Sequence, residues 1–247
     1  MTMILQKNMF SASGTLMKLS AFCIAIVAAA SFILSCNKDN AVMYNNVTMG
    51  FLSDDSRIVT DDGNIYEVVA GKTVEGIDPQ TRVLVTCDIL NRTGKTENQY
   101  DVRLKSIEVP VYGQVADSAD VKDEEWPDAV SVSDAWISGG YLNLYCVWIG
   151  HRDSSVEHGI MLVHDTPASE DADTVSFRLV HNARGEGFSR ETQTAENLTT
   201  VYKTATFPIG NYISGRNVTV KLSWIWHKTS GMYIYPETEP YSITCDL

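Results

Sequence analysis

The stretch Arg82-Val-Leu-Val-Thr-Cys-Asp-Ile-Leu90 decides the fold class, because its apolar side chains recur at every second position. In a strand, Val83, Val85, Cys87 and Ile89 would lie on one face, and Thr86 and Asp88 on the other. A period of two residues is that of a half-buried β-strand, whereas an amphipathic helix repeats every 3.6 residues. No segment shows a convincing helical period, so the sequence predicts an all-β fold.

The segments on either side of this stretch predict a small barrel. Residues 57–60 and 65–69 are joined by Asp61-Asp62-Gly63-Asn64. This pattern is typical of a β-hairpin, because Asp-Gly supplies the positive φ of a tight turn. In residues 100–109 the apolar face slips at Lys105-Ser106, and a β-bulge there would bend the strand as barrel closure requires. With an initial strand near 47–52, the sequence predicts a small five-stranded OB-like barrel.

We expect this barrel over residues 44–111 and further strands from residue 129 to the end. Residues 141–149 are apolar on both faces, which indicates a central strand or one covered by the barrel domain. Cleanly alternating segments follow at 174–182, 217–226 and 241–247. This spacing predicts an antiparallel β-sandwich over residues 129–247. Between the two domains, residues 112–128 are rich in Asp and Glu, and we expect an acidic linker there.

The N-terminal residues predict export rather than folded structure. The apolar block 21–34 follows Met17 and one lysine, which is the layout of a secretory signal. As a helix it would span about 21 Å, well short of a ~30 Å hydrocarbon core. The block ends in Ile33-Leu34-Ser35-Cys36, which resembles a bacterial lipobox. Whether the chain starts at Met1 or Met17 stays open.

We therefore expect a signal peptide over residues 1–35 and a lipidated tether over residues 36–43. The small Ser35 gives a peptidase access to the scissile bond, and the thiol of Cys36 forms a thioether to diacylglycerol. Several acyl tails suffice for stable anchoring without a protein span. An ordinary signal peptide with an incidental cysteine remains the alternative.

The composition limits the classes of partner. The chain has 247 residues with 44% hydrophobic residues, which is enough to bury a core. Acidic residues outnumber basic ones by 31 to 19, for a formal net charge of −12. Phosphate binding needs a basic face, so nucleic acid is excluded as a partner. An anionic membrane repels an acidic protein body, so we expect membrane contact only through the anchor.

Three of the five cysteines, Cys87, Cys146 and Cys245, lie outside the signal and the lipobox. Their spacing fits neither a CxxC motif nor a zinc site. Each falls on the apolar face of an expected strand, so we expect buried thiols. A Cys146–Cys245 disulfide in an oxidising compartment stays open as an alternative.

Several histidines could carry chemistry. A metal cluster could be drawn from His151, His158 and His164, with Asp153 and Glu157. Their spacing matches no known metal signature, so we expect solvated loop residues and no bound metal. His181 falls on the apolar face of its strand, where a hydrogen-bonded core histidine is expected.

Other motifs are weaker. The acidic turn 169–174 lacks the Gly and the distal Glu of an EF-hand, so a solvated turn is expected. A carbohydrate or peptide platform could form from Trp148, Trp224, Trp226, Tyr233 and Tyr235 if they are exposed. Trp224 and Trp226 share an inward face, which favours the core. Nucleophile-elbow, P-loop, zincin and dinucleotide motifs are absent from the sequence, so we expect no cofactor and no enzymatic activity.

Several short pieces, taken in order, resemble a known family. They are the lipobox, Asp-Asp-Gly 61–63, Pro-Gln-Thr-Arg-Val-Leu-Val 79–85, Tyr-Asp-Val-Arg-Leu 100–104, Asp-Ala-Trp 134–136, Gly-Tyr-Leu-Asn-Leu 140–144 and Phe-Arg-Leu-Val-His-Asn-Ala 177–183. Together they resemble the NigD-like lipoproteins of Bacteroidota-type bacteria, over nearly all of the mature chain. The resemblance implies an N-terminal OB-like domain, a C-terminal β-sandwich and lipidation at Cys36. It implies no catalytic or ligand-binding residue.

These observations predict a lipid-anchored, non-enzymatic protein of the bacterial cell envelope that interacts with a protein or glycan partner or binds a ligand. The outer membrane is the expected location, and its periplasmic or surface face stays open. The alternative is an envelope hydrolase acting on glycan or peptide with unrecognised acidic catalysts. That alternative requires a concave pocket with titratable groups in perturbed environments. The family name adds a bacteriocin-related self-protection role as a third possibility.

Overall fold

The computed structural model describes residues 43–92, 97–165, 174–186, 197–213, 218–225, 227–230, 233–236 and 241–246. The predicted signal peptide, Cys36 and nearly all of the tether lie outside these residues, as do Trp226 and nearly all of the acidic turn 169–174. The side chains of Tyr233, Tyr235 and Cys245 are likewise outside the description. Within it, no helix has the length and apolar character needed to cross a membrane.

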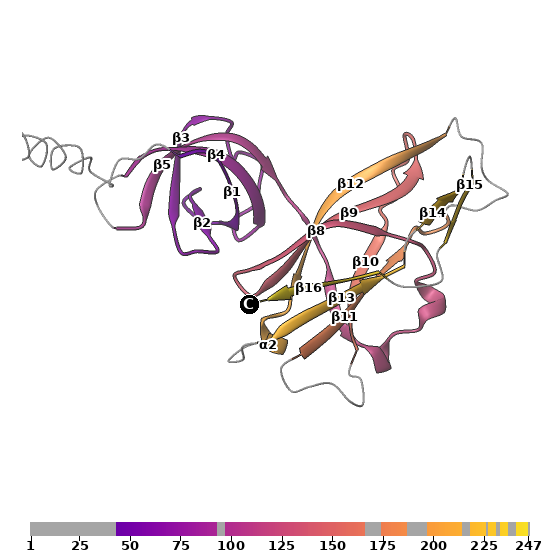
Figure 1. Ribbon diagram of the computed structural model, residues 1–247. Helices are drawn as coiled ribbons and strands as arrows, with labels where there is room; N and C mark the ends of the chain where they lie inside the picture. Colours follow the sequence, from indigo (N-terminus) through magenta and orange to yellow (C-terminus); the bar gives the residue numbers. More distant parts are fainter. Residues whose placement is uncertain are drawn as a thin grey trace, which may run out of the picture. The chain divides into compact units, whose positions relative to one another are not determined.

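Strands dominate the described residues, and the predicted all-β fold class is confirmed (Figure 1). The barrel strands are β1 (Met43–Leu52), β2 (Ile58–Thr60), β3 (Ile65–Gly71), β4 (Arg82–Arg92) and β5 (Gln99–Glu108). They close in the order β1-β2-β3-β5-β4, with β1 antiparallel to β4 and β3 parallel to β5. A closed barrel of five strands in this order is the predicted OB-like barrel.

Two local predictions for the barrel are confirmed. Gly63 has a φ of 78° in the turn between β2 and β3. The pairing of β4 with β5 shifts register between Thr86 and Cys87, where Lys105 is the extra residue of a bulge. The bulge keeps the apolar side chains of both strands pointing inward. The barrel core is formed by Leu52, Ile58, Tyr66, Val83, Val85, Cys87, Val102 and Leu104.

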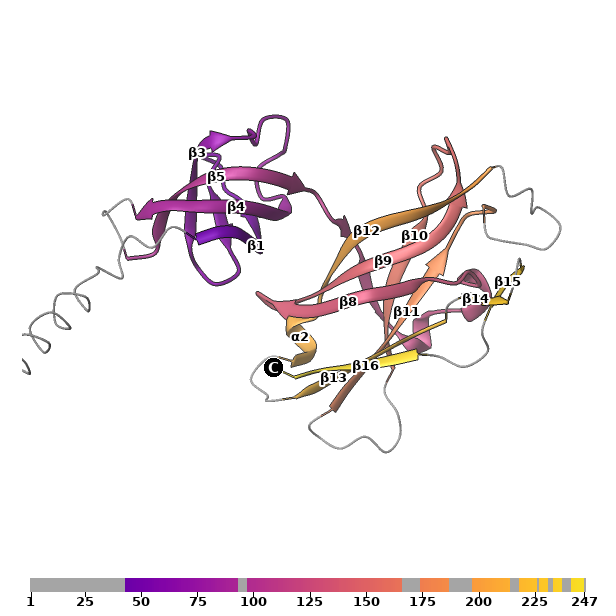
Figure 2. The same cartoon turned by 45° about the horizontal axis from the view of Figure 1, so that its top comes forward.

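The sandwich consists of two sheets, in the orders β16-β13-β11-β10-β7 and β6-β12-β9-β8 (Figure 2). Its strands are β6 (Val111–Tyr112), β7 (Gln114–Asp117), β8 (Ser131–Ser138), β9 (Tyr141–His151), β10 (Gly159–Asp165), β11 (Thr174–Asn182), β12 (Leu198–Pro208), β13 (Thr219–Trp224) and β16 (Tyr241–Asp246). A separate two-stranded sheet pairs β14 (His227–Ser230) with β15 (Tyr233–Pro236), and α2 (Gly210–Ile213) is a single helical turn.

The expected acidic linker over residues 112–128 is a prediction that the structure corrects. β6 pairs with β12, and β7 pairs with β10, so both short strands belong to the sandwich. Both pairings are parallel, as is that of β11 with β13, so the sheets are mixed rather than wholly antiparallel. Strands of two and four residues are too short for a period to be visible in the sequence.

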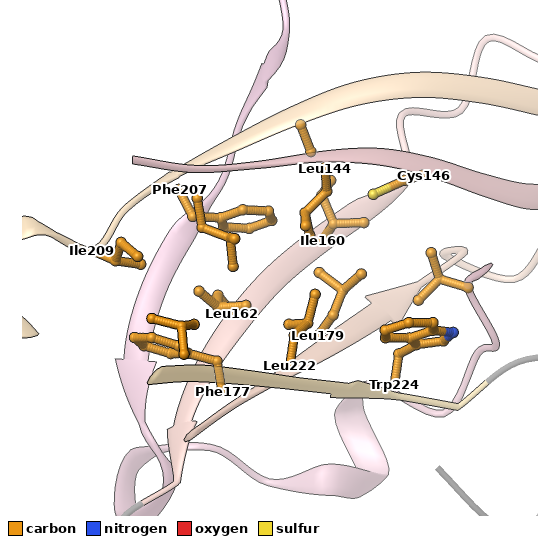
Figure 3. Packing of buried hydrophobic residues seen from close by; sticks show 14 of the residues in the cluster. Leu144, Cys146, Ile160, Leu162, Phe177, Leu179, Phe207, Ile209, Leu222 and Trp224 are labelled. Atoms are coloured by element: carbon orange, nitrogen blue, oxygen red, sulfur yellow. The ribbon is translucent and has the colours of Figure 1, made fainter. Parts of the chain in front are cut away.

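The core of the sandwich lies between the inward faces of its two sheets (Figure 3). β9 lies between β12 and β8, the central position that its two apolar faces predict. Trp148 is 7% and Trp224 is 5% exposed, so both belong to the core rather than to an exposed platform. The inward side chains of β11 predicted from the sequence, Val175, Phe177, Leu179 and His181, are all buried.

A buried arginine joins barrel residues to sandwich residues. Arg82 is 3% exposed at the start of β4. Its guanidinium donates to both carboxylate oxygens of Asp61, at 2.9 and 2.7 Å. Its Nε donates to Oγ1 of Thr206 in β12 at 2.9 Å, and Nη2 donates to Oδ1 of Asn143 in β9 at 3.2 Å. Charge-assisted, bidentate hydrogen bonds of this kind are the strong ones.

Two aromatic rings and a glycine turn pack closely around the Arg82–Asp61 pair. Its guanidinium carbon lies 5.1 Å from the ring centre of Phe51 and 3.9 Å from that of Tyr141, both within cation–π range. Gly139 has a φ of 57°. A Cβ at this position would lie 2.6 Å from Oδ1 of Asp61, so only glycine lets the turn between β8 and β9 reach the carboxylate.

Replacing Asp61 tests this junction. Asp61→Ala is expected to lower the free energy of unfolding by about 3–5 kcal/mol, because the buried guanidinium loses its counter-charge. Urea unfolding of the mature chain with Cys36→Ala measures the effect. The matched control, Asp55→Ala, removes the carboxylate of an exposed ion pair with Arg57 and should change the midpoint little. Equal losses in the two variants would contradict a structural role for the junction.

Candidate functional site

Three aromatic side chains meet at one end of the sandwich core. They are Trp148 in β9, His158 just before β10, and His181 near the end of β11. The rings of Trp148 and His158 stack with 5.6 Å between centres, and His181 lies 5.3 Å from Trp148 and 5.1 Å from His158. Side chains two residues apart in an extended chain share a face, so His158 follows Ile160 inward and His181 follows Leu179.

A chain of polar contacts runs through these histidines. Nδ1 of His181 lies 3.0 Å from the carbonyl oxygen of Ala129, and its Nε2 lies 3.0 Å from Nδ1 of His158. On the other side of His158, Nε2 lies 3.5 Å from Oε2 of Glu186. The other oxygen of Glu186 accepts a hydrogen bond from the hydroxyl of Ser154. The chain connects a buried carbonyl to a half-buried carboxylate.

This end of the sandwich contains a cavity of about 380 Å³. Its lining combines apolar side chains with polar and charged ones, among them Trp148, Ile160, Val201, His158, Glu186 and Lys203. A volume of this size, with a few convergent polar groups on an aromatic surface, is typical of a small-ligand site. We therefore treat this sandwich cavity as the candidate functional site.

Glu186 is the acidic group of the cavity. The Ser154 hydroxyl, assisted by His158 and by the charge of His151, holds the pKa of Glu186 below its usual value despite partial burial. The side chain is therefore ionised at neutral pH. A lowered pKa suits Glu186 to pair with a positive charge, whereas a general acid at neutral pH would need a raised one.

The structure separates the histidines that the sequence groups together. We expected a solvated His158, but the structure corrects this expectation, because the side chain is only 5% exposed. His151 lines the same cavity. His164 instead contacts Asp117, with 3.0 Å between Nδ1 and Oδ1. Among the described side chains, no group of three or more His, Cys, Asp or Glu is placed to hold a metal ion.

His181 is the hydrogen-bonded core histidine that the sequence predicts, at 1% exposure. Glu186 and Ser154 carry no signal in the sequence, because both lie outside strands, where no period applies. For His158 a signal exists, since it stands two residues before the buried Ile160 and so continues the inward face of β10.

The described thiols behave as expected. Cys87 and Cys146 are buried and free, so the alternative of a Cys146–Cys245 disulfide is not present. Burial raises the pKa of Cys146 to about 12 and also raises that of Cys87. Neither thiol is suited to act as a nucleophile.

A larger, open cavity of about 760 Å³ lies against β3 of the barrel. Residues 55–57 and 67–75 line it, and none of its acidic or basic side chains is buried. Two of them, Asp55 and Arg57, pair with each other. Exposed, mutually paired charges give this cavity less capacity for specific chemistry than the sandwich cavity has.

The lowered pKa of Glu186 predicts an acid dependence of stability. A carboxylate with a depressed folded-state pKa contributes stability that is complete above its unfolded value, here 4.5, and is lost as the pH falls through the lower folded value. Glu186→Gln should therefore lose less stability than the parent chain between neutral pH and pH values below 4.5. Urea midpoints measured across this range test it, and parallel curves for the two proteins would contradict it.

Comparisons with known proteins place this fold. Residues 114–232 match the family model described as NigD-like C-terminal beta sandwich domain. No curated protein matches the sequence. A protein of unknown function from Bacteroides vulgatus is a solved structure with the same fold, at a TM-score of 0.59 and 17% identity, covering 82% of this chain and 91% of that one.

Two further solved structures share the fold. A NigD-like immunity protein from Bacteroides caccae aligns with a TM-score of 0.54 and 20% identity, over 78% of this chain and 90% of that one. A putative lipoprotein from Bacteroides fragilis aligns with a TM-score of 0.54 and 8% identity, over 83% and 98%. The resemblance predicted from the sequence is confirmed for the C-terminal domain: residues 114–232 match the NigD-like β-sandwich model.

Proposed function

We propose that the mature chain is a lipid-anchored, non-enzymatic protein of the cell envelope whose sandwich cavity binds a ligand or a side chain of a partner. The observation that carries the proposal is the cavity of about 380 Å³ with Trp148, His158 and Glu186 in its lining. A buried ring system beside an ionised carboxylate offers both contact area and a fixed charge for recognition.

The anchor is supported by the sequence and by one relative. Cys36 follows the apolar block and the small Ser35, as in a lipobox. A solved protein of the same fold is described as a putative lipoprotein. Acylation at Cys36 would hold the acidic ectodomain at a membrane, of which the outer membrane is the proposed one.

Hydrogen-bond directions argue against nucleophilic catalysis in the cavity. In a serine–histidine–acid triad, the serine hydroxyl donates to a histidine nitrogen, and the acid accepts from the other nitrogen of that ring. Here the Ser154 hydroxyl donates to Glu186, and Nδ1 of His158 contacts His181. The three residue types of a triad are present but are not connected as in a triad, which supports a binding role.

An envelope hydrolase is the second candidate. One observation favours it: the cavity contains a titratable group, Glu186, whose pKa is shifted by its neighbours, and perturbed groups in a cavity cluster at functional sites. The shift is downward, so Glu186 would have to act as a base or as an electrostatic stabiliser rather than as an acid.

A protein partner is a further possibility for the ligand. One solved relative is described as a NigD-like immunity protein, a term that implies an interaction with another protein. The cavity would then accept a side chain of that partner, and the same cross-linking experiment below would detect it.

Replacing the lipidated cysteine tests the anchor. Cys36→Ala is expected to move the protein from the membrane pellet and the detergent phase to the soluble fraction, because no acyl chain can be attached. The matched control is Cys87→Ala, which changes a buried barrel thiol and should leave the protein in the membrane fraction. Unchanged partitioning of Cys36→Ala would refute lipid anchoring at this residue.

Site-specific cross-linking in intact cells tests the cavity. A photoreactive residue at Val156, which lines the cavity and is 42% exposed, should give one defined adduct. The same residue at Tyr202, which is 74% exposed on β12 and does not line the cavity, is the control. Mass spectrometry identifies the adduct. Equal labelling at both positions would refute a specific cavity ligand, and release of a cleaved glycan or peptide by the purified chain would favour the hydrolase.

A further inference from the structure

The direction of each hydrogen bond in the histidine chain follows from one carbonyl group. The oxygen of Ala129 can only accept, so Nδ1 of His181 carries a proton and donates to it. His181 is 1% exposed, and a second proton would place a costly charge inside the core. Its Nε2 therefore presents a lone pair, and Nδ1 of His158 must donate to it.

This assignment decides what His158 shows to the cavity. Because Nδ1 carries the proton of the neutral ring, Nε2 bears a lone pair and can only accept, unless the ring takes up a second proton. Nε2 lies 3.5 Å from the ionised Oε2 of Glu186. In neutral His158, the lone pair of Nε2 therefore faces a lone pair of the Glu186 carboxylate, which is repulsive. When His158 is an imidazolium, its Nε2–H and the carboxylate attract each other.

We propose that His158 and Glu186 form a proton-dependent clasp that holds the loop 152–158 against the turn 183–186 and so regulates the sandwich cavity. Control of access to the cavity rests on the proposed ligand-binding function, whereas the contact between His158 and Glu186 does not. The clasp itself is carried by the hydrogen-bond directions.

The clasp joins the two segments that continue from the paired ends of β10 and β11, where Gly159 lies opposite Asn182. The loop 152–158 connects β9 to β10, and Ser154, Val156 and His158 in it all line the cavity. Glu186 lies in the turn that follows β11, where its backbone N–H donates to the carbonyl oxygen of Ala183. Across the gap, Glu186 contacts both Ser154 and His158. One carboxylate thus fastens both the middle and the end of the loop.

Several further charged and titratable groups lie around the pair. Facing it are His181 from β11, His151 from β9, Glu157 from the loop and Lys203 from β12. The clasp closes where Glu186 is ionised and His158 carries a proton on both ring nitrogens, and it opens when Nε2 of His158 loses its proton.

Nuclear magnetic resonance of the histidine side chains tests the clasp without any ligand. The sample is the ¹⁵N-labelled mature chain with Cys36→Ala, titrated from acidic to alkaline pH. The neutral ring of His158 is expected to carry its proton on Nδ1, and Glu186→Gln is expected to make the doubly protonated ring less stable, because its negative partner is removed. Hydrogen exchange of the Val156 amide should accelerate with pH beyond the intrinsic rate in the parent chain, and should be fast at every pH in Glu186→Gln.

A matched pair elsewhere supplies the control. His164 and Asp117 form a second histidine–carboxylate pair, with 3.0 Å between Nδ1 and Oδ1, and Asp117→Asn should leave the protonation of His158 unchanged. A neutral His158 with its proton on Nε2, or a doubly protonated ring that Glu186→Gln does not make less stable, would overturn the clasp. If the clasp titrates as expected but Val156 gives no cross-linked adduct, the proposed ligand binding fails while the clasp stands.

Discussion

The guanidinium of Arg82 is the charged group on which the arrangement of the described strands depends. Burying an ion pair carries a desolvation cost that is offset only when further hydrogen bonds satisfy the remaining donors. Asp61 alone does not provide them, and the side chains of Asn143 and Thr206 accept two more of these hydrogen bonds. The barrel strand β4 therefore reaches its low-energy state only when β9 and β12 of the sandwich are in place.

The fold was largely predictable from the sequence, whereas this junction was not. A period of two marks β4, β11 and β13, and the slip at Lys105 identifies the bulge in β5, because each depends on residues close together in the chain. The partners of Arg82 are 21, 61 and 124 residues away, and nothing local distinguishes it from an exposed strand-end arginine. The strands β6 and β7 were not predicted for a related reason. Segments of two and four residues are too short to show a period, and they are strands only because they pair with β12 and β10.

In the candidate site, too, some residues could be predicted from their neighbours in the sequence and others could not. His181 could be assigned to the core because it continues the inward face of β11. His158 continues the inward face of β10, but the polar residues before it hide this in the sequence. Glu186 could not be predicted, because its role depends on the approach of a turn after β11 to the loop before β10. The NigD-like resemblance gave the sandwich but assigned no residue in its cavity.

At the proposed envelope location, the two free thiols of the described body have a consequence for the lifetime of the protein. Cys87 and Cys146 belong to separate cores, one in the barrel and one in the sandwich. Each is shielded from oxidants only while its own core is intact. In an oxidising compartment, transient opening of either core would expose a sulfur to mixed-disulfide formation or oxidation. Damage to one sulfur would then prevent reclosure, so the working lifetime of the protein would be set by how seldom its cores open rather than by its equilibrium stability.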